Sequence, residues 1–293
     1  MPKLTSVLSF VVLGLFSLPA PVFAQALMPY ALQPDAADLE QQGLSLAQDA
    51  VQLARFQQVE MALSRAQLAT QLAPKKFETW FLLGSLYVQT KEIDKGIESL
   101  QKAKSLAPNN EGILFTLGSA YFQKSDYNQA VTLIQTGLKI KPDVPEALFD
   151  LGNAYFRLGR LSDAIAQYDK AVKSEAKFWP AINNTGLVKY EQGDVDGAIK
   201  DWRSALQLGK NEPEPELALA VALYAKGDQE QGLRLGEAAL KKDARYGDLK
   251  FLEENLWGDR LRAETKKFLE IPRIQAIIAD AKDQLPVQKT TPQ

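Results

Sequence analysis

The apolar and small residues of this chain recur with a period of 34 between residues 77 and 178. The first copy, Trp80, Leu83, Gly84, Tyr87, Gly96, Leu100, Ala103 and Pro108, returns one period later as Leu114, Leu117, Gly118, Tyr121, Ala130, Ile134, Gly137 and Pro142. A third copy reads Leu148, Leu151, Gly152, Tyr155, Ala164, Tyr168 and Ala171, with Ala176 in place of the proline. A fixed period of this length indicates a repeat architecture, in which each repeat is one small supersecondary unit.

Each recurring position has a packing role if every unit is a pair of helices. A glycine in the first helix, at positions such as Gly84 and Gly152, allows that helix to approach the second one closely. The tyrosines fill the space between helices, and the prolines end the second helix because proline cannot continue its hydrogen bonding. The pairs Gly193-Asp194 and Gly227-Asp228 combine a residue suited to left-handed geometry with a helix N-cap, so they predict the turn inside a unit.

These residues resemble the tetratricopeptide repeat (TPR) family, whose fold is a right-handed solenoid of helix pairs. Weaker copies flank the clear ones: the first keeps Ala62, Ala69 and Pro74 but has Asp49 and Ala50 where Leu-Gly is expected. We therefore predict an all-α chain with six units, at residues 43–76, 77–110, 111–144, 145–178, 179–212 and 213–246.

Outside the repeats, three further segments are expected. Residues 247–284 keep helical apolar spacing but lose the period of 34, so we expect a C-terminal helical cap over the open side of the last unit. Residues 25–42 are expected to form an N-terminal tail and lead-in. Residues 285–293 carry little apolar surface and are expected to be a disordered tail.

The composition excludes several classes of site. The chain contains no cysteine and no histidine, which removes thiol nucleophiles, thiolate or imidazole metal sites and imidazole-based triads. Solenoid and cap together leave no room for a catalytic domain. We therefore expect no catalytic residues, no metal, no cofactor, no small-molecule substrate and no enzymatic activity. With 36 acidic and 34 basic residues and no basic tract, nucleic acid is not an expected partner either.

The first 24 residues have the pattern of a signal peptide. Lys3 is followed by the apolar stretch 4–18 and then by small residues, so cleavage is expected after Ala24, with Ala26 as the alternative. An uncleaved membrane anchor is the competing interpretation, but the apolar stretch is shorter than the roughly 20 residues of a spanning helix. We expect an exported protein of the periplasm or the thylakoid lumen. The segment 257–272 is similar to that of cyanobacterial and chloroplast lumenal TPR proteins.

The resemblance also implies where a partner would bind. In the TPR family the first helices line a concave surface, and positions five, nine, twelve and thirteen of each unit face it. The corresponding peptide-groove residues here are Phe81, Val88, Gln89, Phe115, Phe122, Gln123, Phe149, Asn153, Phe156, Arg157, Asn183, Tyr190 and Tyr224. The competing interpretation is that these aromatic residues belong to the core, because the general TPR pattern already favours them.

Two functions follow from these features of the sequence. The first is a non-catalytic scaffold or assembly factor that holds a protein or peptide client in the groove, outside the cytoplasm, and meets a membrane only through a membrane-protein client. The alternative is a structural or regulatory subunit of a cell-envelope or thylakoid complex, which could associate with itself.

Overall fold

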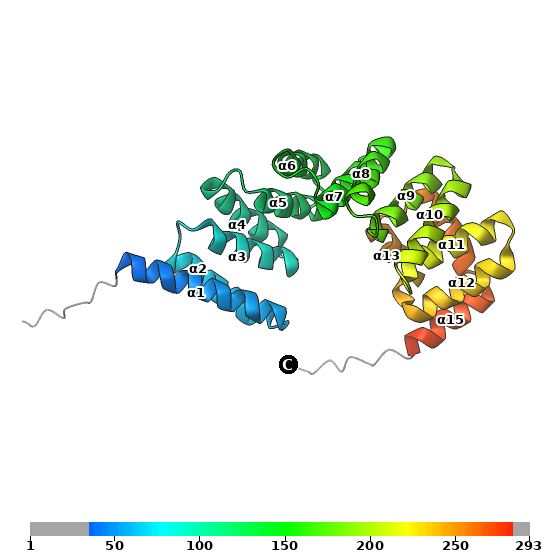
Figure 1. Cartoon of the computed structure of the whole chain (residues 1–293). Helices are drawn as coiled ribbons and strands as arrows, with labels where there is room; N and C mark the ends of the chain where they lie inside the picture. The colour runs from blue at the N-terminus through cyan, green and yellow to red at the C-terminus, as the bar shows by residue number, and fades with distance from the viewer. Residues whose placement is uncertain (1–34, 284–293) are drawn as a thin grey trace, which may run out of the picture.

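The computed structural model describes residues 35–283, and all regular elements within that range are helices (Figure 1). They are α1 (Ala36–Arg55), α2 (Val59–Leu72), α3 (Phe77–Gln89), α4 (Ile93–Leu106), α5 (Glu111–Gln123), α6 (Tyr127–Ile140), α7 (Pro145–Arg157), α8 (Leu161–Ser174), α9 (Trp179–Gln192), α10 (Val195–Leu208), α11 (Pro213–Lys226), α12 (Gln229–Lys242), the 3-10 turn η1 (Ala244–Gly247), α13 (Leu249–Glu254), α14 (Asp259–Leu269) and α15 (Pro272–Asp283).

The first twelve helices form six consecutive pairs, from α1–α2 to α11–α12. Each pair packs most extensively within itself, and each second helix then packs on the first helix of the next pair. The pairs follow a curved path, with α4, α6 and α8 on its outer side and α3, α5 and α7 toward the inside (Figure 1). The predicted all-α solenoid is therefore confirmed.

The turn inside each pair uses one left-handed residue at the same place in all six units. This residue is the fifteenth of its 34-residue unit. In chain order the six are Gln57, Lys91, Ser125, Gly159, Gly193 and Gly227, with φ of 61°, 64°, 64°, 71°, 91° and 105°. In the last two units the next residue is an aspartate whose carboxylate accepts a hydrogen bond from the backbone of the following helix, at Gly197 and Gln231. The turns predicted from Gly193-Asp194 and Gly227-Asp228 are confirmed.

Four glycines at the same position of their first helices lie where the two helices of a pair meet. A Cβ atom at Gly84, Gly118, Gly152 or Gly186 would come within 2.4 to 2.7 Å of the large residue opposite it. At Gly152 that residue is Tyr168, which is fully buried, and the added Cβ would lie 2.4 Å from its Cε1. Only a residue without a side chain fits there.

We expect Gly152→Ala to lower the free energy of unfolding by about 1–3 kcal/mol, because the added methyl group overpacks a ring that cannot move away. Gly112→Ala is the matched control: its Cβ would lie 3.3 Å from Asn110 Oδ1 and 3.8 Å from Phe81, and alanine favours the helix. Urea unfolding of both variants measures the difference. Equal stability of the two variants would contradict the close approach at Gly152.

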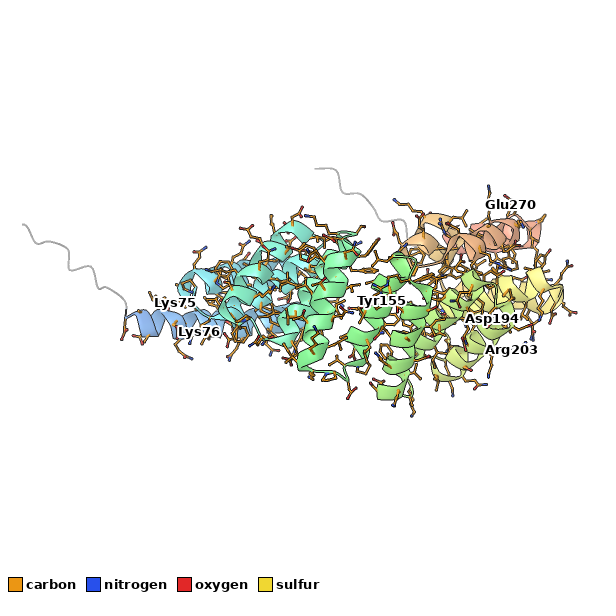
Figure 2. The ribbon with its side chains drawn as sticks, turned by 90° about the horizontal axis from the view of Figure 1, so that it is seen from above. Lys75, Lys76, Tyr155, Asp194, Arg203 and Glu270 are labelled. Atoms are coloured by element: carbon orange, nitrogen blue, oxygen red, sulfur yellow. The ribbon has the colours of Figure 1, made fainter. Side chains whose placement is uncertain are left out.

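Neighbouring units in the first half of the solenoid are joined by a repeated hydrogen bond. The Gln67, Gln101 and Gln135 side chains each donate to the hydroxyl of a tyrosine in the next unit, Tyr87, Tyr121 and Tyr155, at 2.8, 2.9 and 2.7 Å. Tyr155 lies near the middle of the molecule in Figure 2. The tyrosines therefore connect consecutive units as well as filling the space inside one.

The N-terminal end begins earlier than the repeat does. Helix α1 starts at Ala36, seven residues before the predicted first unit, because the Asp35 carboxylate caps it by accepting from the Ala37 amide at 3.0 Å. Phe56 and Met61, at this end, are 74% and 51% exposed. The predicted signal peptide and cleavage site lie outside the described residues, as does the tail 285–293.

The segment after Gly247 folds as three helices that close the C-terminal end. Helix α15 packs on α12, the outer helix of the last pair. Helix α14 instead packs on α9 and α11, which are first helices of their pairs. Seen from above, Glu270 beside α14 lies on the edge opposite Arg203 of α10 (Figure 2). Among the described residues, no helix is both long enough and apolar enough to cross a membrane.

Candidate functional site

The residues that the sequence assigns to a groove differ in accessibility along the solenoid. Gln89 and Gln123 are exposed, whereas Asn153, Asn183 and Tyr190 are only 8%, 1% and 2% exposed. The other eight are half-buried, namely Phe81, Val88, Phe115, Phe122, Phe149, Phe156, Arg157 and Tyr224. A uniform row of open positions is therefore not present.

Two of the aromatic residues lean toward the second helix of their own unit. The Phe115 ring lies against Gly137, whose Cβ position would be 2.5 Å from it, and the Phe149 ring lies 5.8 Å from that of Tyr168. Phe149 also makes an edge-on contact with Phe178 at 5.6 Å. Both rings support the helix pairs and leave only part of their surface to the groove.

Near the middle of the solenoid the two predicted amides, Asn153 and Asn183, are linked through Asn184. Asn153 Oδ1 accepts from the Tyr168 hydroxyl at 2.8 Å and from Asn184 Nδ2 at 2.9 Å. Asn183 Nδ2 donates to Asn184 Oδ1 at 3.1 Å. This buried network joins side chains of α7, α8 and α9, although Asn183 Oδ1 is left without a hydrogen-bond partner among the described residues. These amide groups are buried and contribute hydrogen bonds within the chain, so they are not exposed for contact with a partner.

The C-terminal part of the concave face is filled by the chain itself. Trp257 is 1% exposed and donates its indole N–H to Glu214 Oε1 at 3.2 Å. From α14, Leu261 and Phe268 enter the same apolar cluster as Leu217 of α11. Tyr190 and Tyr224 therefore do not face open solvent: the Phe268 ring lies 5.3 Å from Tyr224 and the Arg260 guanidinium 5.6 Å from Tyr190.

Two residues at the thirteenth position of their units, Arg157 and Glu191, bind either side of the connection between α13 and α14. Arg157 Nη2 donates to the carbonyls of Glu253 and Glu254, at 2.6 and 3.2 Å, where α13 ends. The Glu191 carboxylate accepts from the amides of Arg260 and Leu261, both at 3.0 Å, in the first turn of α14. Because Gly258 offers no side chain as an N-cap, Glu191 caps that helix from another element.

The N-terminal part of the concave face remains open. A cavity of about 540 Å³ lies between α1 and α3. It is lined by Leu44, Ala47, Gln48, Val51, Glu78, Phe81, Leu82 and Ser85. Most of these side chains are apolar, and Glu78 is the one charged residue among them. An apolar concave site with a few polar groups is the usual form of a binding site.

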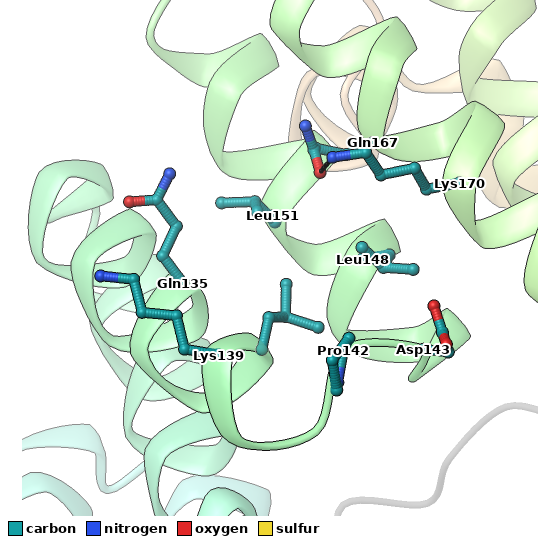
Figure 3. A pocket seen from close by; sticks show the side chains of 9 residues that line it. Gln135, Lys139, Pro142, Asp143, Leu148, Leu151, Gln167 and Lys170 are labelled. Atoms are coloured by element: carbon teal, nitrogen blue, oxygen red, sulfur yellow. Dashed lines mark hydrogen bonds between the residues drawn. The ribbon is translucent and has the colours of Figure 1, made fainter.

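A different cavity, of about 470 Å³, lies between the second helices α6 and α8 (Figure 3). Leu148 and Leu151 of α7 form its floor, while Lys139 and Lys170 stand on opposite sides of it. Its rim of long polar side chains contrasts with the apolar lining between α1 and α3. We therefore take the α1–α3 cavity as the candidate site.

Burial raises the pKa of two acids, Asp150 on α7 of the fourth unit and Glu214 on α11 of the sixth. It raises the pKa of Glu214 to about 7, against the hydrogen bonds from Trp257 and Asn183, which lower it. Burial, with a smaller contribution from Glu146, raises the pKa of Asp150 to about 6. Within residues 35–283, no three acidic side chains gather in the way that a metal ion would need.

Comparison with known proteins decides the family. Models of the tetratricopeptide repeat match residues 77–110, 115–180 and 183–246, more than half of the chain. The chain belongs to the tetratricopeptide repeat family. No curated protein sequence matches this TPR chain significantly.

Solved TPR structures share the fold at low sequence identity. The pilF protein of Pseudomonas aeruginosa is 14% identical, with a TM-score of 0.62 over 74% of this chain and 98% of its own. A MamA protein is 22% identical, with a TM-score of 0.52 over 66% and 97%. YrrB, described as a TPR protein with an unusual peptide-binding site, is 19% identical, with a TM-score of 0.52 over 65% and 94%. At these identities the similarity shows the TPR fold alone.

Part of this TPR site was not predicted from the sequence. Leu44, Val51 and Leu82 line the open cavity, yet the predicted groove began at Phe81 and used only positions five, nine, twelve and thirteen. The cavity uses positions two, five, six and nine of the first two units. The weak first repeat carried that signal, because its Leu44, Ala47 and Val51 keep the same register.

Proposed function

We propose that this TPR protein is a non-catalytic scaffold or assembly factor that binds a segment of a client protein. The observation that carries the proposal is the apolar cavity between α1 and α3, which remains open while the chain covers the corresponding surface of its last units. TPR proteins bind protein or peptide partners, and the lining offers apolar contact rather than the basic groups that nucleic acid would require.

Leu82→Lys should weaken client binding at least tenfold, because it replaces an apolar contact in the lining with a charged side chain that a bound apolar segment would have to desolvate. Leu68→Lys is the matched control, since Leu68 lies on α2 outside the cavity and is 40% exposed. Native client captured by the parent protein would be identified and its affinity for each variant measured. A client that binds the parent and Leu82→Lys equally well would place recognition elsewhere.

We further propose that the protein acts outside the cytoplasm, in the periplasm or the thylakoid lumen. The support is the signal-like pattern of the first 24 residues. The mature chain is then expected to begin at Gln25, which the intact mass and N-terminal sequence of the native protein would show. Recovery of the full-length chain from the membrane fraction would contradict this.

A second function is a self-associating structural subunit. The exposed Phe56 and Met61 at the N-terminal end of the solenoid favour it, because exposed apolar residues at the end of a repeat stack can seat another copy. Light scattering on the purified mature chain distinguishes the two functions: a monomer supports the client-binding scaffold, and a stable oligomer supports the structural subunit.

A further inference from the structure

The open cavity and the covered surface occupy equivalent positions of the repeat. Four units after the lining residues Leu44, Ala47, Gln48, Val51, Glu78, Phe81, Leu82 and Ser85 come Pro180, Asn183, Asn184, Leu187, Glu214, Leu217, Ala218 and Val221. Within this second set Leu187, Leu217 and Ala218 are completely buried, and Val221 is 1% exposed. Among residues 35–283, the same surface is therefore open in the first two units and filled in the last two.

The segment that fills the second surface shows what this kind of surface accepts. It consists of a tryptophan followed by a short helix whose Leu261, Thr265 and Phe268 are all buried. Leu261 and Phe268 join the cluster formed by α9 and α11, while the charged residues of α14 lie outside it. This is the helix-in-groove mode of recognition, with apolar anchors about one and two turns apart.

One polar contact fixes the tryptophan in that arrangement. Glu214, at the second position of its unit, accepts the indole N–H of Trp257 at 3.2 Å. Glu78 occupies the second position of the second unit and lines the open cavity, where it is exposed. Its carboxylate is thus available for the same contact with a donor from another molecule.

We propose that the α1–α3 cavity binds an amphipathic helical segment of the client, entered by a tryptophan whose indole N–H is accepted by Glu78. This rests on the proposed client-binding function and specifies its partner. The open surface has Ala47 and Phe81 at the positions where the covered surface has Asn183 and Leu217. It is therefore apolar at a position where the covered surface has an amide. The anchors of the client segment are accordingly aliphatic or aromatic, and its donor lies at the end nearest Glu78.

The test uses a synthetic peptide with the sequence of residues 248–270 as the probe, labelled with a fluorophore, and the mature full-length protein. Two changes are combined in a double-mutant cycle: Trp257→Phe in the peptide, which keeps an aromatic ring but removes the N–H, and Glu78→Ala in the protein. Each change alone should weaken binding about tenfold, as expected for a hydrogen bond to a charged group. Together they should weaken it no more than either one does, because they remove the same contact.

Three results would overturn the inference. The first is absence of peptide binding, and the second is full additivity of the two changes. The third is binding that Glu78→Ala leaves intact but Glu214→Ala alters, since the peptide would then have exchanged with the chain's own cap. The proposed function is tested separately, with the native client. If Leu82→Lys abolishes client binding but Glu78→Ala leaves the affinity unchanged, the client-binding function holds and the tryptophan contact with Glu78 is wrong.

Discussion

Trp257→Ala should lower the free energy of unfolding by about 3–5 kcal/mol, the range for removing a large buried aromatic side chain. Trp257 is 1% exposed and lies in one cluster with Leu217 and Phe268, so the change leaves a cavity between the cap and the solenoid. It also removes the donor that Glu214 accepts from. Urea unfolding followed by circular dichroism measures the loss.

Trp80→Ala is the matched control for this substitution. Trp80 is half-buried, and its indole N–H is bonded to the exposed carbonyl of Pro74 at 2.9 Å, so the same change should cost less there. Binding of a hydrophobic dye should rise in Trp257→Ala only, as the last two units lose their cover. A Trp257→Ala protein as stable as the parent would mean that the segment after Gly247 is not part of the core.

The stability of the protein should fall as the pH rises from about 4.5 to 7. The pKa of Glu214 is raised to about 7 from its ordinary value of 4.5, so between these values the folded state holds a proton that the unfolded state has lost. The contribution of protonated Glu214 to the free energy of unfolding is complete below pH 4.5 and disappears as the pH passes 7. For this one group the change is about 3 kcal/mol. The raised pKa of Asp150 acts in the same direction at lower pH.

Glu214→Gln isolates this effect, because glutamine keeps the acceptor for Trp257 without a titrating proton. The variant should lose much of the decline and be more stable than the parent at pH 8. Unfolding in urea at a series of pH values would show this, with Glu78→Gln, at the equivalent position of the second unit, as the control for the substitution itself. Parallel profiles for parent and Glu214→Gln would exclude Glu214 as the origin of the decline.

The repeat could be predicted from the sequence because its determinants are local. The glycine at position eight of a unit faces a large residue sixteen positions later, as Gly152 faces Tyr168, and that relation is contained within one unit of 34. The left-handed turn residue was visible as glycine in the last three units. At Gln57, Lys91 and Ser125 the same conformation is adopted by ordinary residues, so only the repeat register could have located it.

Which part of the concave surface is open and which is covered could not be predicted in this way. Phe81 and Leu217 have the same register in their units, yet Phe81 lines the open cavity whereas Leu217 is buried in one cluster with Phe268. The difference arises from the segment after Gly247, which does not follow the repeat. Its docking depends on contacts between residues far apart in sequence, such as Glu191 with Leu261, 70 residues apart. The apolar spacing predicted helices there but not the surface on which they lie.

The three C-terminal helices support only one end of the stack, and this makes the two ends unequal in local unfolding. In a solenoid each unit is held mainly by its neighbours. Within the part of the chain that the structure describes, α1 and α2 have a neighbouring unit on one side only, so they should open more often than the interior units. The open cavity is built from α1 and α3, so it shares this least supported region. A client bound there would favour the closed form by mass action, and amide hydrogen exchange in α1 would slow in proportion to client concentration. The site for the client is thus also where the client can do most to order the protein.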